Sequence, residues 1–391
     1  MTQFMKQKEE IIMKLVHYFI TEENYEPMIV NGVRNEIWLE NLQAEYKIIR
    51  INSNYIHNND QLLADNYKIK NITKQITKKT YTFNMKTINL LLDVGEKVEL
   101  KDTKKISNYK VDNYKDIRSD NNIAGIFPKL KTMSLKKDNS FDDFINITND
   151  INAKSESKNK RFEKIFSPKK IVITKVLICL NILIFILTMF SDTLFNRLIL
   201  DPSAVRNGEV YRLLTCIFMH SSILHLVVNM YSLSILGNQL ENFLGKTKFI
   251  IIYLISGLSG SLLSCILTNT YSLGASGAIF GLLSSLLYFG FQYRLYLGSV
   301  LIKEILPVIL FNLLIGFTLS GIDNAAHIGG LIGGLFITIA LGVDSETNKT
   351  TKINGYITLF IYLLLLSYLL FFKYILIICA KYIPATFLEK L

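Results

Sequence analysis

The segment GASGAIFGLLSSLLYFGFQ, residues 274–292, carries almost only small and apolar side chains and has a serine, Ser276, near its start. An apolar helix of about 20 residues is long enough to cross the hydrocarbon layer of a membrane. A serine at a helix start commonly caps the helix or bonds its own backbone. Here Gly274 and Gly277 leave the hydroxyl approachable, and the unpaired N–H groups of a helix start favour nearby negative charge. The segment therefore predicts a membrane helix that begins at a candidate nucleophile.

Six further apolar runs surround this segment, so the C-terminal half is predicted to be a membrane protein of the all-α class. The seven predicted spans are residues 171–190, 221–240, 247–268, 276–292, 301–320, 322–342 and 354–380. Seven basic residues precede the first span: Lys154, Lys158, Lys160, Arg161, Lys164, Lys169 and Lys170. Basic residues mark cytoplasmic segments, which predicts a multi-pass protein of the cell membrane with a cytoplasmic N-terminus and an extracytoplasmic C-terminus. A lipid bilayer explains the basic excess better than nucleic acid does, and no nucleic-acid partner is expected.

The sixth span contains GIDNAAHIGGLIGG, residues 321–334, with an ionisable group inside the membrane. Such groups are costly in a bilayer and call for an explanation. His327, Gly330 and Gly334 are spaced i, i+3 and i+7, so the imidazole shares a helix face with two glycines. Small residues let helix backbones approach closely, and the fourth span has a similar stripe in Gly277 and Gly281. A histidine that is merely hydrogen-bonded inside the bundle is the alternative.

The second span adds a pair of hydrogen-bond donors, His225 and Asn229, which lie one turn apart on one helix face. Two donors aimed at a developing negative charge suit acyl transfer in a dry site, although polar packing between helices is the simpler interpretation of the pair alone. Alternating span direction gives spans two, four and six the same direction. Ser276, His327, His225 and Asn229 are therefore expected at similar depth, toward the outer side.

These motifs together resemble the rhomboid intramembrane proteases, over about residues 165–345. The similarity rests on residues 274–277, on residues 326–330 with Gly334, and on His220 with His225 and Asn229. It implies a six-helix rhomboid core at 169–345, followed by a seventh transmembrane helix at 346–391. Tyr211-Arg212 stands where the family usually has Trp-Arg.

The resemblance implies a Ser276–His327 dyad that cleaves transmembrane segments of membrane proteins at helix-destabilised sites, without metal or organic cofactor. His225, Asn229, Gly274 and the Ser276 amide are then expected around the oxyanion and substrate, with supporting roles for the remaining residues of the predicted site. Those are His220, Phe280, Gly277, Gly330, Gly334, Glu241 and Arg212. Asp323, one turn before His327, is spaced for contact with it, and a direct role in catalysis stays open. A catalytically silent rhomboid-like protein that binds membrane clients for quality control is the alternative function.

The first 130 residues are predicted to form a small soluble α/β domain, cytoplasmic and with an unknown partner. EIWLENL and YKIIRIN have the pattern of strands, and residues 60–93 that of one or two helices. Residues 131–168 are predicted to be a basic linker. Glu40 with Glu45-Tyr46-Lys47 resembles a nuclease metal site, but solvent-facing charges on a sheet are the favoured interpretation.

Overall fold

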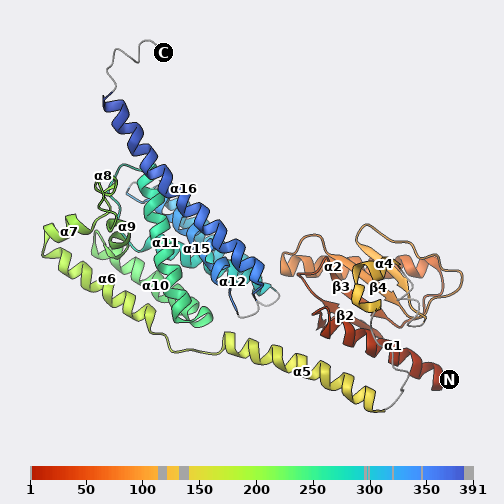
Figure 1. Cartoon of the computed structure of the whole chain (residues 1–391). Coiled ribbons are helices and arrows are strands. Elements are labelled where there is room, and N and C mark those ends of the chain that lie inside the picture. Colours follow the sequence, from red (N-terminus) through yellow and green to blue (C-terminus); the bar gives the residue numbers. More distant parts are fainter. Residues whose placement is uncertain are drawn as a thin grey trace, which may run out of the picture. The chain divides into compact units, whose positions relative to one another are not determined.

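The structure is a computed structural model that describes residues 2–112, 121–131, 141–294, 297, 300–318, 321–344 and 347–382. The chain divides into two compact units, residues 1–162 and 163–391 (Figure 1).

The first unit contains a five-stranded mixed sheet with helices on both faces. Its elements are α1 (Thr2–Thr21), β1 (Glu26–Met28), β2 (Glu36–Glu40), β3 (Tyr46–Asn52), α2 (Asn59–Thr80), β4 (Lys86–Leu91), β5 (Ile106–Lys110), α4 (Asn121–Ile126), the 3-10 helix η1 (Pro128–Lys131) and α5 (Phe141–Phe166), of which the last four residues belong to the second unit. The strand order is β1-β2-β3-β4-β5. β2 is antiparallel to both of its neighbours, whereas β3, β4 and β5 are parallel.

Alternation along the strands explains the layers of this unit, because successive side chains point to opposite faces. Leu39 and Ile49 pack with Leu15 of α1 on one face. Trp38 and Ile48 pack with Ile69 of α2 on the other. The sheet is therefore buried on both sides between α1 and α2.

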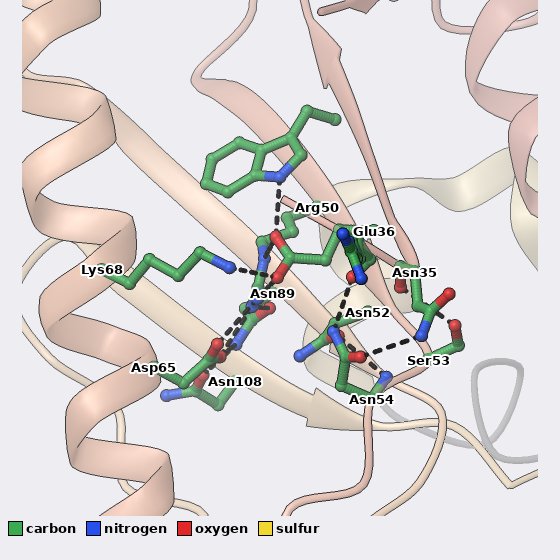
Figure 2. A network of polar contacts seen from close by, with 12 residues as sticks. Asn35, Glu36, Arg50, Asn52, Ser53, Asn54, Asp65, Lys68, Asn89 and Asn108 are labelled. Atoms are coloured by element: carbon green, nitrogen blue, oxygen red, sulfur yellow. Dashed lines mark hydrogen bonds and ion pairs between the residues drawn. The ribbon is translucent and has the colours of Figure 1, made fainter. Parts of the chain in front are cut away.

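A buried polar network lies on the α2 face of the sheet (Figure 2). Arg50 of β3 is fully buried and donates hydrogen bonds to Glu36, Asp65 and Asn89. Burial opposes ionisation of Glu36, but hydrogen bonds from Arg50 and Lys68 outweigh it and lower the pKa of Glu36 to about 2. Two carboxylates thus balance two cations inside the domain.

The structure corrects one element that the sequence pattern misassigned. Residues 60–93 were expected to form one or two helices, yet α2 ends at Thr80 and residues 86–91 form β4, next to the central strand β3. Tyr81 and Asn84 adopt left-handed backbone conformations that terminate the helix and turn the chain. The range predicted to be a linker, 131–168, contains α5, whose Asp150 contacts His17 and whose Lys158 pairs with Glu26.

The second unit is a helical bundle. Its elements are α6 (Ile173–Met189), α7 (Asp192–Leu198), α8 (Pro202–Arg206), α9 (Arg212–Thr215), η2 (Cys216–Phe218), α10 (Ile223–Leu244), α11 (Lys246–Leu267), α12 (Ser276–Gln292), the π-helix η3 (Leu301–Ile305), α14 (Leu306–Thr318), α15 (Asn324–Leu341) and α16 (Lys349–Tyr382). α11, α12 and α15 pack against one another at its centre, and α16 lies beside α11 and α15 (Figure 1).

The long apolar helices overlap the stretches expected to span a membrane, with bounds that differ by a few residues at α10, α11 and α16. Among the described residues, three helices are by themselves long and apolar enough to cross one, at Lys246–Leu267, Asn324–Leu341 and Lys349–Phe372. The pair Arg212–Phe218 and Ile223–Leu244, bent by 92°, makes a fourth if counted as one span, and α6 and α12 are shorter apolar helices.

Candidate active site

Ser276 is the first residue of α12, and the preceding turn fixes its position. Gly274 has a φ of +130°, which a residue with a side chain rarely adopts, and its N–H donates to Cys216 O at 3.0 Å. A Cβ on Gly274 would lie 2.9 Å from both Cε1 and Nε2 of His225. Only glycine therefore leaves room for the His225 ring beside the start of α12.

His327 of α15 faces Ser276 across the α12–α15 contact. Its Nε2 lies 3.0 Å from Ser276 Oγ, within hydrogen-bond distance. The imidazole is 7% exposed and stacks on Phe280, with ring centroids 4.1 Å apart and an angle of 12° between the ring planes. Phe280 lies one turn below Ser276 on α12, so a single helix supplies both the hydroxyl and the ring that orients its neighbour.

Glycines set the distance between these two helices. A Cβ on Gly330 would lie 1.9 Å from Gly277 O, and one on Gly334 would lie 2.4 Å from Gly281 Cα. Both values are far below a normal contact, so the backbones of α12 and α15 touch directly. This close approach brings two side chains 51 positions apart in the sequence within hydrogen-bond distance.

Asp323 serves as the N-terminal cap of α15. Its carboxylate accepts hydrogen bonds from Ala326 N at 2.9 Å and from Ser264 Oγ at 2.5 Å. His327 Nδ1 has no hydrogen-bond partner within the described part of the chain. The geometry therefore gives Asp323 a structural role and does not place its carboxylate on the imidazole.

The two donors of α10 differ in how they lie. The Ser222 side chain caps the helix by accepting from His225 N, and Ser221 Oγ lies 3.1 Å from His225 Nδ1, which leaves His225 Nε2 beside Gly274. Asn229 is 5% exposed, and its Nδ2 donates to His225 O at 3.0 Å. The Asn229 amide is thus bonded to its own helix in this state.

Three predicted supporting residues stabilise the surroundings. His220 is buried and meets the His225 ring edge to face, with centroids 5.1 Å apart. Glu241 accepts from the backbone N–H groups of residues 172, 173 and 174 and so caps α6. Arg212 donates to the carbonyl oxygens of Asn196 and Ile199, which holds the chain after α6 in place.

Sequence reasoning missed the hydroxyl groups of α11. Ser264 binds the Asp323 cap, and Ser259 Oγ donates to Gly329 O at 2.7 Å while lying 3.1 Å from Tyr362 Oη of α16. The run of serines and glycines through residues 256–264 is the signal that could have indicated a close polar contact there.

No group of three or more His, Cys, Asp or Glu side chains able to hold a metal ion occurs among the residues that the structure describes. In the first unit, Glu40 is buried, whereas Glu45 is exposed and pairs with Lys86 at 2.6 Å. Glu45 therefore matches the expected solvent-facing arrangement, whereas Glu40 does not, because its side chain is covered by the fold.

Comparison with known proteins places this bundle in a class of membrane proteins. The Rhomboid domain family model matches residues 207–343, which include all four residues expected at the reaction centre. The rhomboid protease GluP of Bacillus subtilis is 34% identical over 235 residues, covering 56% of this chain and 46% of that protein. The putative rhomboid protease YdcA of the same organism is 35% identical over 136 residues, covering 34% of this chain and 68% of that protein. RHOMBOID-like protein 5 of Arabidopsis thaliana is 39% identical over 147 residues, covering 36% of this chain and 47% of that protein.

The chain belongs to the rhomboid family, as the sequence motifs predicted, and is a membrane protein with transmembrane helices. It spans about half the length of the first two relatives, GluP and RHOMBOID-like protein 5.

Proposed function

We propose that the chain is a serine endopeptidase that cleaves transmembrane segments of other membrane proteins, with Ser276 as nucleophile and His327 as general base. The observation that carries the proposal is the 3.0 Å approach of Ser276 Oγ to His327 Nε2 inside a family whose named relatives include proteases. A hydroxyl hydrogen-bonded to an oriented imidazole is the arrangement that activates serine for attack on a carbonyl.

The reaction follows from this pair. His327 Nε2 takes the proton of Ser276 as Oγ attacks the scissile carbonyl carbon. Collapse of the tetrahedral intermediate breaks the C–N bond, and the imidazolium returns the proton to the leaving amine. Water, deprotonated by the same imidazole, then attacks the acyl-enzyme; the ester C–O bond breaks, the imidazolium returns the proton to Ser276 Oγ, and the second product is released as a carboxylic acid.

The oxyanion of the tetrahedral intermediate needs donors that are already in position. The Ser276 N–H at the start of α12 and the His225 ring beside Gly274 supply two of them. The Asn229 amide supplies a third when it exchanges its bond to His225 O for one to substrate. A peptide bond in a helix is shielded by its own hydrogen bonds, so the substrate segment must unwind locally and is expected to contain helix-breaking residues.

The proposal includes a membrane arrangement. The basic residues before α6 favour a cytoplasmic location for the first unit, as a soluble α/β domain, in a protein of the cell membrane. α16, with an apolar segment at 349–372, is then a seventh transmembrane helix after the six-helix core.

A serine-directed fluorophosphonate probe tests the nucleophile without knowledge of the substrate. We expect covalent labelling of the folded wild type at Ser276, and loss of labelling in Ser276→Ala and in His327→Ala. Ser284→Ala is the matched control, because Ser284 lies on the same helix and bonds Gly281 O within it. Its labelling is expected to equal that of the wild type.

Cleavage of a fluorescent transmembrane substrate by the purified protein then tests the reaction. Activity that survives Ser276→Ala would refute the assignment. Binding of such segments by the wild type without labelling or cleavage would instead support the silent client-binding function.

A further inference from the structure

Helix α2 of the first unit presents a stripe of exposed side chains that packing within the unit does not use. The stripe consists of Leu63, Tyr67, Lys70, Lys74 and Lys78, called here the α2 stripe. Its spacings of four, three, four and four residues follow the helical repeat, so all five side chains lie on one face. Leu63 is 65% exposed and Tyr67 is 64% exposed.

Another face of α2 is packed against the sheet. Leu62, Asn66, Ile69 and Thr73 are buried on that side. The helix therefore cannot rotate to hide Leu63 and Tyr67 without losing its packing on the sheet, and the stripe stays directed outward.

The three lysines of the stripe differ from the neighbouring Lys68, which pairs with the buried Glu36. Lys70, Lys74 and Lys78 form no ion pair with any residue in the part of the chain that the structure describes. Asp60, the acidic residue in the first turn of α2, precedes Leu63 by three residues and so lies at the other end of the helix from the lysines. The stripe is thus apolar at its N-terminal end and cationic at its C-terminal end.

We propose that the α2 stripe docks on the anionic surface of a lipid bilayer. Leu63 and Tyr67, at the N-terminal end of the stripe, are residue types that insert at the boundary between lipid headgroups and acyl chains. The lysines suit the negative lipid headgroups, each strengthening the attraction roughly fivefold near the surface.

A bilayer is favoured over other anionic partners because the transmembrane helices of the same chain hold the first unit next to a bilayer. The first unit continues through α5 into α6, an apolar helix of a membrane protein, and this covalent link keeps the effective concentration of lipid surface high. Docking goes beyond the proposed proteolysis and involves neither Ser276 nor His327.

The test uses the full chain in lipid nanodiscs and a tryptophan introduced by Tyr67→Trp. The natural chain has a single tryptophan, Trp38, which is 2% exposed and so shielded from lipid. Acyl chains carrying bromine quench an indole that touches them. We expect quenching of the introduced indole in nanodiscs that contain phosphatidylglycerol, and little in nanodiscs of phosphatidylcholine alone.

Two triple variants in this background separate the stripe from general charge. Lys70→Gln/Lys74→Gln/Lys78→Gln is expected to weaken docking on the order of 100-fold and abolish quenching. Lys97→Gln/Lys104→Gln/Lys105→Gln removes the same charge from exposed positions elsewhere in the unit and is expected to keep it. Raising the salt to about 1 M shortens electrostatic reach to roughly 3 Å and should reverse docking.

Equal quenching in both lipids, or an unchanged signal in the stripe variant, would overturn the proposal. Equal loss in both triple variants would also overturn it, because net charge rather than the stripe would then attract the unit. Burial of the introduced indole without bromine quenching would assign the stripe to a protein partner instead. All six lysines are exposed, so these substitutions leave the packed core unchanged.

Discussion

The substitution Gly330→Ala tests whether close contact between α12 and α15 creates the Ser276–His327 pair. The added Cβ would lie 1.9 Å from Gly277 O, about 1.5 Å short of the 3.4 Å at which ordinary contact begins. Backbone atoms on both sides cannot swing away as a side-chain end can. The helices must therefore separate by roughly that distance.

The expected loss of activity follows from this separation. The present 3.0 Å between Ser276 Oγ and His327 Nε2 would grow to about 4.5 Å, beyond hydrogen-bond distance. A misplacement of about 1 Å between reacting groups commonly costs on the order of 100-fold in rate. We expect the rate of fluorophosphonate labelling to fall by at least that factor, with about 1–3 kcal/mol lost in stability from overpacking.

Gly257→Ala is the matched control on α11. The three atoms nearest to its added Cβ all belong to the side chain of Ile217, the closest at 2.9 Å, so this substitution meets a side chain rather than backbone. Labelling of this variant is expected within a few-fold of wild type. Thermal unfolding of each variant shows whether it is folded when assayed. A folded Gly330→Ala protein that labels at the wild-type rate would refute the view that the glycine contact positions the dyad.

Three further predictions concern buried charges. Asp323→Asn keeps an oxygen that can cap α15, so its fluorophosphonate labelling is expected within a few-fold of wild type. Asp323→Ala removes the cap and should lower the free energy of unfolding by about 1 kcal/mol. Loss of labelling in Asp323→Asn as complete as in Ser276→Ala would instead make Asp323 catalytic. Arg50→Met leaves two carboxylates buried without their guanidinium and should destabilise the first unit by about 3–5 kcal/mol, seen as faster proteolysis of that unit; unchanged resistance would contradict the network's role. Burial, together with the nearby negative charge of Glu26, raises the pKa of Glu40 from 4.5 to about 7. The carboxyl of Glu40 therefore loses its proton at lower pH in the unfolded chain than in the folded one, and the free energy of unfolding falls as the pH rises from 4.5 to 7. Glu40→Gln should remove that decline and raise stability at pH 8 by up to about 3 kcal/mol, measured by thermal unfolding; equal pH dependence in both proteins would show that Glu40 does not cause it.

The residue pairs of the candidate site could be found from the sequence because polar groups are rare in apolar helices. Ser276 and His327 each stand beside glycines at helical spacing, and that pattern indicated which faces meet. The partners of Asp323 could not be found in this way. Spacing alone allowed a contact with His327, and only the fold shows that the helix start and Ser264 bind the carboxylate instead.

In the first unit, strand β3 coincides with the stretch YKIIRIN that sequence alternation predicted. The neighbouring strand β4 was mistaken for helix, because a short apolar run such as TINLLL fits a buried strand and a buried helix equally. The distinction comes from tertiary contact, since Ile88 and Leu90 pack with α1 and Asn89 bonds Arg50. Local sequence carries no record of these partners.

The placement of the candidate site at helix starts has an electrostatic consequence. Ser276 is the first residue of α12, His225 the third of α10 and His327 the fourth of α15. Because these three residues converge, the positive ends of three helix dipoles surround one point. In the proposed reaction, that field favours the oxyanion of the tetrahedral intermediate. In the proposed reaction the two features thus act together: the close glycine contacts set the distance between Ser276 and His327, and the helix starts stabilise the oxyanion of the substrate.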